Sequence, residues 1–219
     1  MKIAFTSDTH FPVDVKKWFK EPLDVFVHAG DLMTTGYPED FHKCIQWLAE
    51  VPATHRFYIC GNHDFHMQLY PGPALQELRA IGVKVIGLPG NNNYNSVILP
   101  NGMSLLGLPY VTNLPHWAFN IEPEALEAHL TKMGKHDIIV AHSPIHDVLD
   151  AVPREGLGNF HTGIKAYRKY VQLHKPKYFI NGHIHESYGH KMYNDCAVYN
   201  VAMCNRNYEH ANPPIVLEL

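Results

Sequence analysis

Short apolar segments alternate with amphipathic segments along most of the chain. The apolar segments have the length and composition of buried strands, and they span residues 2–7, 25–29, 57–60, 83–88, 138–141 and 178–181. Between them, apolar residues recur at helical spacing. These helical sets are Phe41, Ile45 and Leu48, then Leu126, Leu130 and Met133, then Ile164, Tyr167 and Val171. Strands that alternate with helices predict an α/β fold.

Two segments depart from this alternation and predict β-hairpins. Residues 97–99 and 104–106 flank Asn101-Gly102, a pair that favours a type I′ turn, and residues 188–193 and 197–201 flank Asn194-Asp195. Antiparallel pairs in an α/β chain indicate mixed sheets. We therefore expect a four-layer αββα sandwich, with two mixed sheets face to face and helices outside.

No internal repeat or linker interrupts the sequence, so residues 1–219 are predicted to form a single domain. The polar run Asn91-Asn92-Asn93 predicts a loop.

Composition narrows the functional classes. The chain of 219 residues has a net charge of -3 and no long basic run, so a nucleic-acid partner is not expected. No run approaches the ~18 apolar residues of a membrane span, and the first residues resemble a strand more than a signal peptide. We therefore expect a cytoplasmic protein without a membrane partner. The four cysteines are scattered, which predicts buried, reduced thiols.

Ligand-type side chains cluster directly after several of the apolar segments. Because functional groups gather beyond the carboxyl ends of strands in α/β sheets, we expect these clusters to share one crevice. The high count of 17 histidines also favours a metal site. The clusters are Ser7-Asp8-Thr9-His10, His28-Ala29-Gly30-Asp31, Gly61-Asn62-His63-Asp64, Ala141-His142-Ser143 and Gly182-His183-Ile184-His185.

The donor types predict the kind of metal. Carboxylate, imidazole and amide donors together favour Mn, Fe or Zn, with Ni and Co also compatible, over Ca²⁺. No cysteine lies in the clusters, which argues against a structural zinc site. The donors are too many for one ion, and Asp31 has two oxygens with which to bridge a pair about 3.5 Å apart. In Asp8-Thr9-His10 and His183-Ile184-His185, an extended backbone would point both outer side chains to one site.

These motifs resemble those of the calcineurin-like metallophosphoesterase superfamily, and they span most of the chain. The motifs are Asp8-x-His10, Gly30-Asp31, Gly61-Asn62-His63-Asp64, His142 and Gly182-His183-x-His185, in that order. The C-terminal part is similar to the small metallophosphoesterase-domain (MPPED-type) proteins. It shares with them Gly182-His183-Ile184-His185-Glu186-x-Tyr188-Gly189 and the ending Asn212-Pro213-Pro214-Ile215-Val216.

One departure from a branch of that superfamily is informative. The phosphoprotein phosphatases follow their Gly-Asp with Val-Asp-Arg-Gly, and the Arg grips phosphate. Here Gly30-Asp31 is followed by Leu32-Met33-Thr34-Thr35, and Asn62-His63 is followed by Asp64 where that branch has Glu. Protein phosphatase activity is therefore not predicted.

The resemblance implies a role for each residue. Asp8, His10, Asp31 and His185 would hold one metal, and Asp31, Asn62, His142 and His183 would hold the other. A hydroxide between the metals would attack phosphorus. His63 would act beside the leaving group, with Asp64 orienting it.

We expect hydrolysis of phosphodiester bonds in small phosphate-ester substrates, with cyclic nucleotides among the candidates. A phosphomonoesterase or nucleotide pyrophosphatase of the same superfamily is the alternative within the enzyme class. A non-catalytic interaction module with this fold is the alternative from another class. The candidate substrate-binding residues are Asn62, His63, Tyr110, Asn113 and His161.

Overall fold

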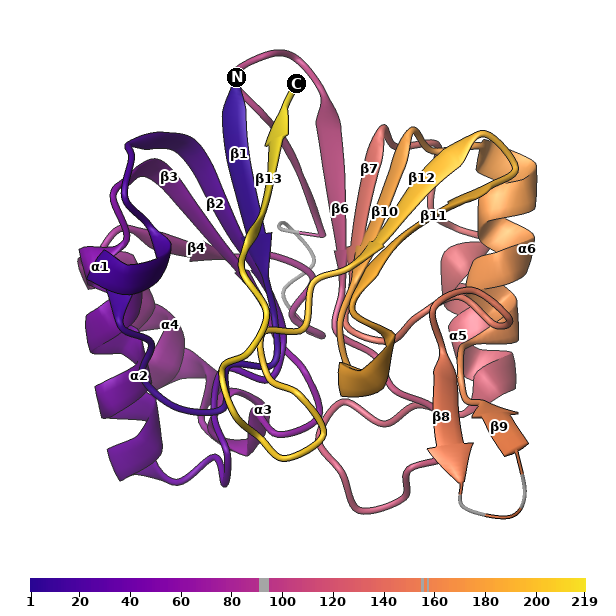
Figure 1. Ribbon diagram of the computed structural model, residues 1–219, viewed down its shortest axis with the longest axis horizontal. Coiled ribbons are helices and arrows are strands. Elements are labelled where there is room, and N and C mark those ends of the chain that lie inside the picture. Colours follow the sequence, from indigo (N-terminus) through magenta and orange to yellow (C-terminus); the bar gives the residue numbers. More distant parts are fainter. Residues whose placement is uncertain (91–94, 155, 157) are drawn as a thin grey trace.

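The structure is a computed structural model that describes residues 1–90, 95–154, 156 and 158–219. The loop predicted at Asn91-Asn92-Asn93 lies outside these residues. Two large sheets face each other, and helices cover the outer face of each sheet (Figure 1). This arrangement confirms the predicted fold class.

The first sheet has five strands in the order β13-β1-β2-β3-β4. Strands β1 to β4 run parallel, and β13 pairs antiparallel with β1. Helices α1, α2 and α4 lie on its outer side (Figure 1). The bounds are β1 (Lys2–Thr6), β2 (Leu23–Ala29), β3 (Ala53–Ile59), β4 (Val83–Val85), β13 (Ile215–Glu218), α1 (Val15–Trp18), α2 (Pro38–Glu50), α3 (Phe65–Leu69) and α4 (Pro71–Ala80).

The second sheet has six strands in the order β11-β12-β10-β7-β6-β5, with α5 and α6 on its outer side (Figure 1). A separate two-stranded hairpin, β8–β9, follows β7 in the chain. The bounds are β5 (Ser96–Ile98), β6 (Ser104–Leu108), β7 (Ile138–Ala141), β8 (Ala151–Arg154), β9 (Gly158–His161), β10 (Tyr178–Asn181), β11 (Gly189–Tyr193), β12 (Cys196–Asn200), α5 (Pro123–Leu130), α6 (Lys165–His174) and the 3₁₀ helix η1 (His185–Ser187).

Strand periodicity builds the core between the sheets. Successive side chains of a strand point to opposite faces, so Ile3 and Phe5 of β1 enter the inter-sheet core while Ala4 packs on the helix side. From the opposite sheet, Ile138 and Val140 enter the same core. This apolar core holds the two sheets in a fixed arrangement. It therefore also fixes the positions of their strand ends relative to one another.

Both predicted hairpins are confirmed, but one turn differs from the prediction. Asn194 and Asp195 have φ of 47° and 62°, as a type I′ turn requires. In the β5–β6 hairpin, only Gly102 has a positive φ, and its N–H donates to Leu99 O. The turn therefore runs over Leu99 to Gly102, with Pro100 at its second position, where its fixed φ fits.

Three further observations concern helix α5, the cysteines and helix length. Helix α5 ends at Leu130, so Met133 of the predicted helical set lies beyond it. All four cysteines are buried and free, as predicted. Within the described ranges, no helix combines the length and apolar character that a bilayer crossing requires.

Candidate metal centre

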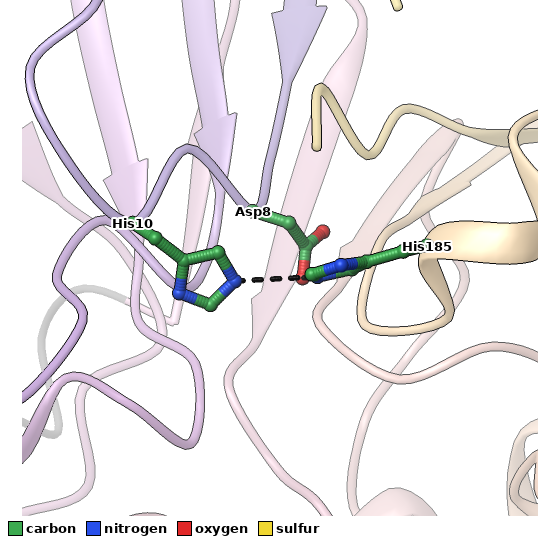
Figure 2. Close-up of side chains that lie close together, drawn as sticks. All are labelled: Asp8, His10 and His185. Carbon is green, nitrogen blue, oxygen red and sulfur yellow. Dashed lines mark hydrogen bonds and ion pairs between the residues drawn. The ribbon is translucent and has the colours of Figure 1, made fainter. Parts of the chain in front are cut away.

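The carboxyl ends of strands from both sheets bring the predicted donors together. Asp8 and His10 follow β1, Asp31 follows β2 and Asn62 follows β3 in the first sheet, whereas His142 follows β7 and His183 and His185 follow β10 in the second. Their donor atoms form groups within 4.8 Å of one another, namely Asp8, His10 and His185, then Asp31, His142 and His183, then His10, Asp31 and His63. Figure 2 shows Asp8 and His10 from one sheet meeting His185 from the other. The site therefore lies at the open seam between the sheets.

A left-handed backbone turns these donors inward. Asp8, His10, Asp31 and His183 have φ of 50°, 56°, 55° and 68°, a region that non-glycine residues seldom adopt and that concentrates at functional sites. The extended backbone predicted for Asp8-Thr9-His10 and His183-Ile184-His185 is therefore wrong. The side chains converge because of these kinks, which are held by bonds such as Asp8 N–H to Gly30 O at 2.9 Å.

Two glycines leave the space that the carboxylates occupy. A Cβ atom on Gly182 would collide with the Asp8 carboxylate and the Ser7 hydroxyl, and one on Gly61 would collide with Asp31. Glycine is thus required at these two positions, because each carboxylate packs directly against the backbone that follows another strand.

Three of the histidines are oriented in the same way. The Nδ1 atoms of His10, His142 and His185 lie 3.2, 3.0 and 3.0 Å from the backbone carbonyls of Met33, Ala29 and Asn205. A carbonyl oxygen can only accept, so each Nδ1 carries the proton. In the neutral ring, Nε2 then carries the lone pair that a metal ion binds.

These lone pairs face one another. His10 Nε2 lies 3.2 Å from His185 Nε2 (Figure 2), and His185 Nε2 lies 3.5 Å from the Asp8 carboxylate. At the second group, His142 Nε2 lies 3.0 Å from Asn62 Oδ1 and 3.3 Å from Asp31 Oδ2. Facing donors of this kind need a positive charge between them, which a proton or a metal ion supplies. The residues therefore fit a pair of metal ions.

The electrostatics of the buried groups agree with this fit. Burial lowers the pKa of His10 and of His183 to about 4, which keeps both rings neutral. Burial also opposes a charge on His142, but the neighbouring Asp31 carboxylate outweighs it and raises the pKa to about 9. The site thus attracts positive charge beside Asp31, as a proton or as a metal ion.

His63 lies next to both groups and opens to the cavity. Its Nδ1 donates to Thr34 O at 2.7 Å, so Nε2, on the other side of the ring, faces away from the loop. Its ring centroid lies 4.6 Å from that of His10 and 4.5 Å from that of Trp117. A ring held in this position can donate a proton to a substrate bound at the metals.

Asp64 does not orient His63 as predicted. Its carboxylate is fully buried and accepts backbone N–H groups of Gly61, Asp31, Leu32 and Met33 at 2.7 to 3.1 Å. The imidazole of His63 instead bonds to the carbonyl of Thr34. Asp64 therefore ties the loop after β3 to the loop after β2, and it acts on the site through the position of Asp31.

A cavity of about 1080 Å³ opens over the donors. Asn62, His63, Asn113 and His161, which are candidate substrate-binding residues, line it, and so does Trp117. The structure does not bring Tyr110 to this cavity. Tyr110 is buried against His129 and lines a separate cavity of about 310 Å³, because its strand end points to the helix side of the sheet.

The sequence prediction missed the loop after β12. Tyr208 packs its ring 4.7 Å from His10 and 5.1 Å from His185, and Arg206 lines the cavity. The same loop supplies Asn205 O, the carbonyl that orients His185. Strand β12 ends at Asn200, several residues before this loop, so the strand-end pattern that located the other donors did not reach these residues.

Comparisons with known proteins agree with the site. A family model described as calcineurin-like phosphoesterase matches residues 1–187. Human metallophosphoesterase domain-containing protein 1 is 30% identical over 237 residues, which cover 100% of this chain and 71% of that protein, and the mouse protein of the same name matches equally.

A solved structure supports the fold alone. The crystal structure of TT1561 of Thermus thermophilus has a TM-score of 0.58 at 17% identity, and the match covers 91% of this chain and 88% of that one. The family match and the human relative, which aligns with the whole of this chain, establish membership of the phosphoesterase family. This membership implies metal-dependent hydrolysis of phosphoesters. This chain belongs to the calcineurin-like phosphoesterase family.

Proposed function

We propose that this chain is a phosphodiesterase that binds two divalent transition metal ions and hydrolyses small substrates. Asp8, His10, Asp31 and His185 would hold one ion. Asp31, Asn62, His142 and His183 would hold the other, so Asp31 would be shared by both. Mn, Fe and Zn suit these donors, with Ni and Co also compatible.

One observation carries the proposal. His10 and His185 come from different sheets, yet their Nε2 atoms lie 3.2 Å apart, and a carbonyl holds the proton of each ring on the other nitrogen. A core that needed only packing would not set two lone pairs against each other beside the Asp8 carboxylate. A cation bound between these donors would stabilise the arrangement.

The residues of the chain have different roles in the proposed reaction. When bound, the metal ions lower the pKa of a water molecule and offset charge on the phosphoryl oxygens. Asp8 and Asp31 reduce the net positive charge of the site, so that it suits a phosphate ester without trapping it. His63 holds a proton at Nε2 for the leaving oxygen. General acid catalysis of this kind raises the reaction rate by about 10²–10⁴-fold.

The segment after Gly30-Asp31 favours a diester. The segment Leu32-Met33-Thr34-Thr35 contains no arginine, and Leu32 and Met33 are fully buried, so it presents no guanidinium to the substrate. A diester carries one negative charge at its phosphate and a monoester carries up to two. This segment therefore adds no positive charge that would favour the more highly charged monoester, and the cationic side chains of the cavity, Lys165, Lys169 and Arg206, lie elsewhere on its wall.

A substrate panel tests this function. Metal-free protein would be loaded with Mn, Fe, Zn, Ni, Co or Mg and assayed on matched diester, monoester and pyrophosphate substrates. We expect the diester to give the highest kcat/KM. Asp8→Asn should abolish turnover, and Asp195→Asn, in the exposed β11–β12 turn, should not. A higher rate on the monoester would contradict the diester preference, and a failure to bind any metal would favour the non-catalytic alternative.

A further inference from the structure

The hairpin β8–β9 carries one histidine to the wall of the cavity. His161 is the last residue of β9 and pairs with Ala151 of β8. Figure 1 shows the hairpin beyond the carboxyl ends of the strands, on the side of α5 and α6. Ser187 of η1 bonds to Ala151 O at 3.2 Å, which links the hairpin to the helix that bears the metal-ligand candidate His185.

Buried Asp150 fixes the base of this hairpin. Its side chain is fully buried, and one oxygen accepts the N–H groups of Asp147 and Gly163 at 3.0 and 2.9 Å. The other oxygen accepts Nδ1–H of His161 at 2.7 Å. A buried carboxylate with three donors holds both the backbone and the imidazole in one orientation.

This orientation leaves the outer nitrogen of His161 free for a ligand. The side chain is 44% exposed and lines the same cavity as Asp31 and His183. Among the residues that the structure describes, Nδ1 bonds to Asp150 and lies 3.8 Å from the Asp147 carboxylate, and no protein group bonds to Nε2. An imidazole oriented by a buried carboxylate and open at Nε2 is a good donor to an anion.

The charges along the cavity wall point to the same class of ligand. Away from the metal donors, the cationic side chains on the wall are Lys165, Lys169 and Arg206, and the acidic ones are Glu127 and Glu186. Lys169 and Glu127 pair at 2.6 Å. The remaining wall therefore has an excess of positive charge, which complements an anion.

We propose that His161 forms a second anion-binding position, which holds a carboxylate or phosphate group that the substrate carries in addition to its scissile phosphate. This inference rests on the proposed function, because the metal centre holds one end of the ligand. The substrate class becomes small phosphate esters with a second acidic group. Asp150 is the positioning residue for this contact.

Non-hydrolysable ligands test the proposal without turnover. The probes are linear phosphonates that end in a carboxylate, with methylene chains of increasing length, and each has a neutral match that ends in an amide. A third arm ends in a second phosphonate. Calorimetry on metal-loaded protein gives the ratio of affinities for the charged and amide ligands. We expect a preference of about tenfold at one chain length, which is the effect of one charge-assisted hydrogen bond.

The variants assign the preference to His161. His161→Gln should remove it and His161→Arg should keep it, whereas His55→Gln, exposed near the start of β3, should leave it unchanged. The same ratio in wild type and His161→Gln at every chain length would overturn the proposal. The carboxylate and phosphonate arms separate the two sources of negative charge.

The two proposals fail in different ways. If the phosphonates bind with the expected preference but no ester is hydrolysed, the second anion position stands and the phosphodiesterase function is wrong. If esters are hydrolysed but no charged terminus is preferred, the function stands and the role of His161 is wrong.

Discussion

At the scale of single residues, the histidines of the metal centre differ from His63 in what their free nitrogens face. Nε2 of His10, His142 and His185 points at other donors, whereas the ring of His63 lies between His10 and the exposed Trp117. This difference supports the proposed roles, in which the first three histidines hold a metal and His63 meets the substrate.

The substitution His63→Gln tests that separation. Gln keeps a hydrogen-bond donor but no titratable proton, so we expect both metals to remain bound and turnover to fall about 10²–10⁴-fold. Metal content by elemental analysis and kcat on a poor leaving group would be measured together. Unchanged turnover would remove His63 from the mechanism, and lost metal would make it a ligand.

The pair of His161 and Asp150 gives a pH-dependent prediction. The pKa of His161 is raised, first by its bond to Asp150 and less by Asp147, while burial and Lys191 oppose this. A raised histidine pKa means that the pair stabilises the fold fully below about pH 6.5 and that this contribution disappears as the pH rises through the folded-state pKa. The ring centroid of His146, a neighbouring titratable group, lies 6.3 Å from that of His161.

Asp150→Asn should therefore lower the pKa of His161, and NMR titration of the ring protons would measure it. Asp195→Asn, in a remote turn, serves as the control. An unchanged pKa of His161 in Asp150→Asn would show that the carboxylate does not hold the proton of this ring.

Residue roles could be predicted from the sequence only where residue type determines them. Asp8, His10 and Asp31 could be placed at one site because their donor types follow apolar strands. The function of Asp64 could not be predicted, because it depends on which backbone N–H groups its carboxylate reaches. Tyr208 was missed because a ring contact across the cavity leaves no periodic pattern in the sequence.

At the scale of elements, four of the seven candidate donors, Asp8, His10, Asp31 and His183, sit where the chain turns in a left-handed kink after a strand. Such kinks hold only where the opposing backbone is close. Gly182, after β10, lies against the Asp8 carboxylate after β1, so the two sheets are in direct contact at the candidate metal centre. The geometry of the site thus depends on small residues as well as on ligands.

Gly182→Ala should displace Asp8 and weaken metal binding at its site, because the added Cβ and the carboxylate cannot occupy the same space. Metal titration would measure a lower stoichiometry or a weaker Kd. Gly72→Ala, in α4, is the matched control, since a Cβ there meets nothing within 4 Å. Equal metal affinity in both variants would contradict this close approach.

Element types were predictable where the periodicity was strong, and local geometry was not. The Asn194-Asp195 turn followed from its residue types, but Pro100 moved the other turn by one residue because it takes the second turn position. The kinks at Asp8 and His183 could not be predicted, because tertiary bonds between strand ends hold them.

At the scale of the whole molecule, the candidate metal centre joins two sheets that also share an apolar core and a backbone bridge between Ser7 and Ala202. Asp31 belongs to the first sheet and His142 to the second. The αββα arrangement could be predicted from strand, helix and hairpin order. The seam between the sheets could not, because its register is set by side-chain packing across the core.

Metal removal should therefore destabilise the fold. A ligand that binds only the folded state adds about 2.7 kcal/mol when its free concentration is about 100 times Kd, which corresponds to a Tm shift of about 5–10 °C for each site. Differential scanning fluorimetry with and without a chelator would measure this shift in wild type and in Asp31→Asn. A chelator effect of equal size in both would contradict a bridging role for Asp31.

The most direct measurement of the central claim is the EPR spectrum of protein loaded with Mn²⁺, with the metal content determined on the same sample. Two ions that share an Asp31 oxygen, about 3.5 Å apart, should give an exchange-coupled spectrum at a stoichiometry of two per chain. One ion per chain, or two ions with uncoupled spectra, would contradict the account.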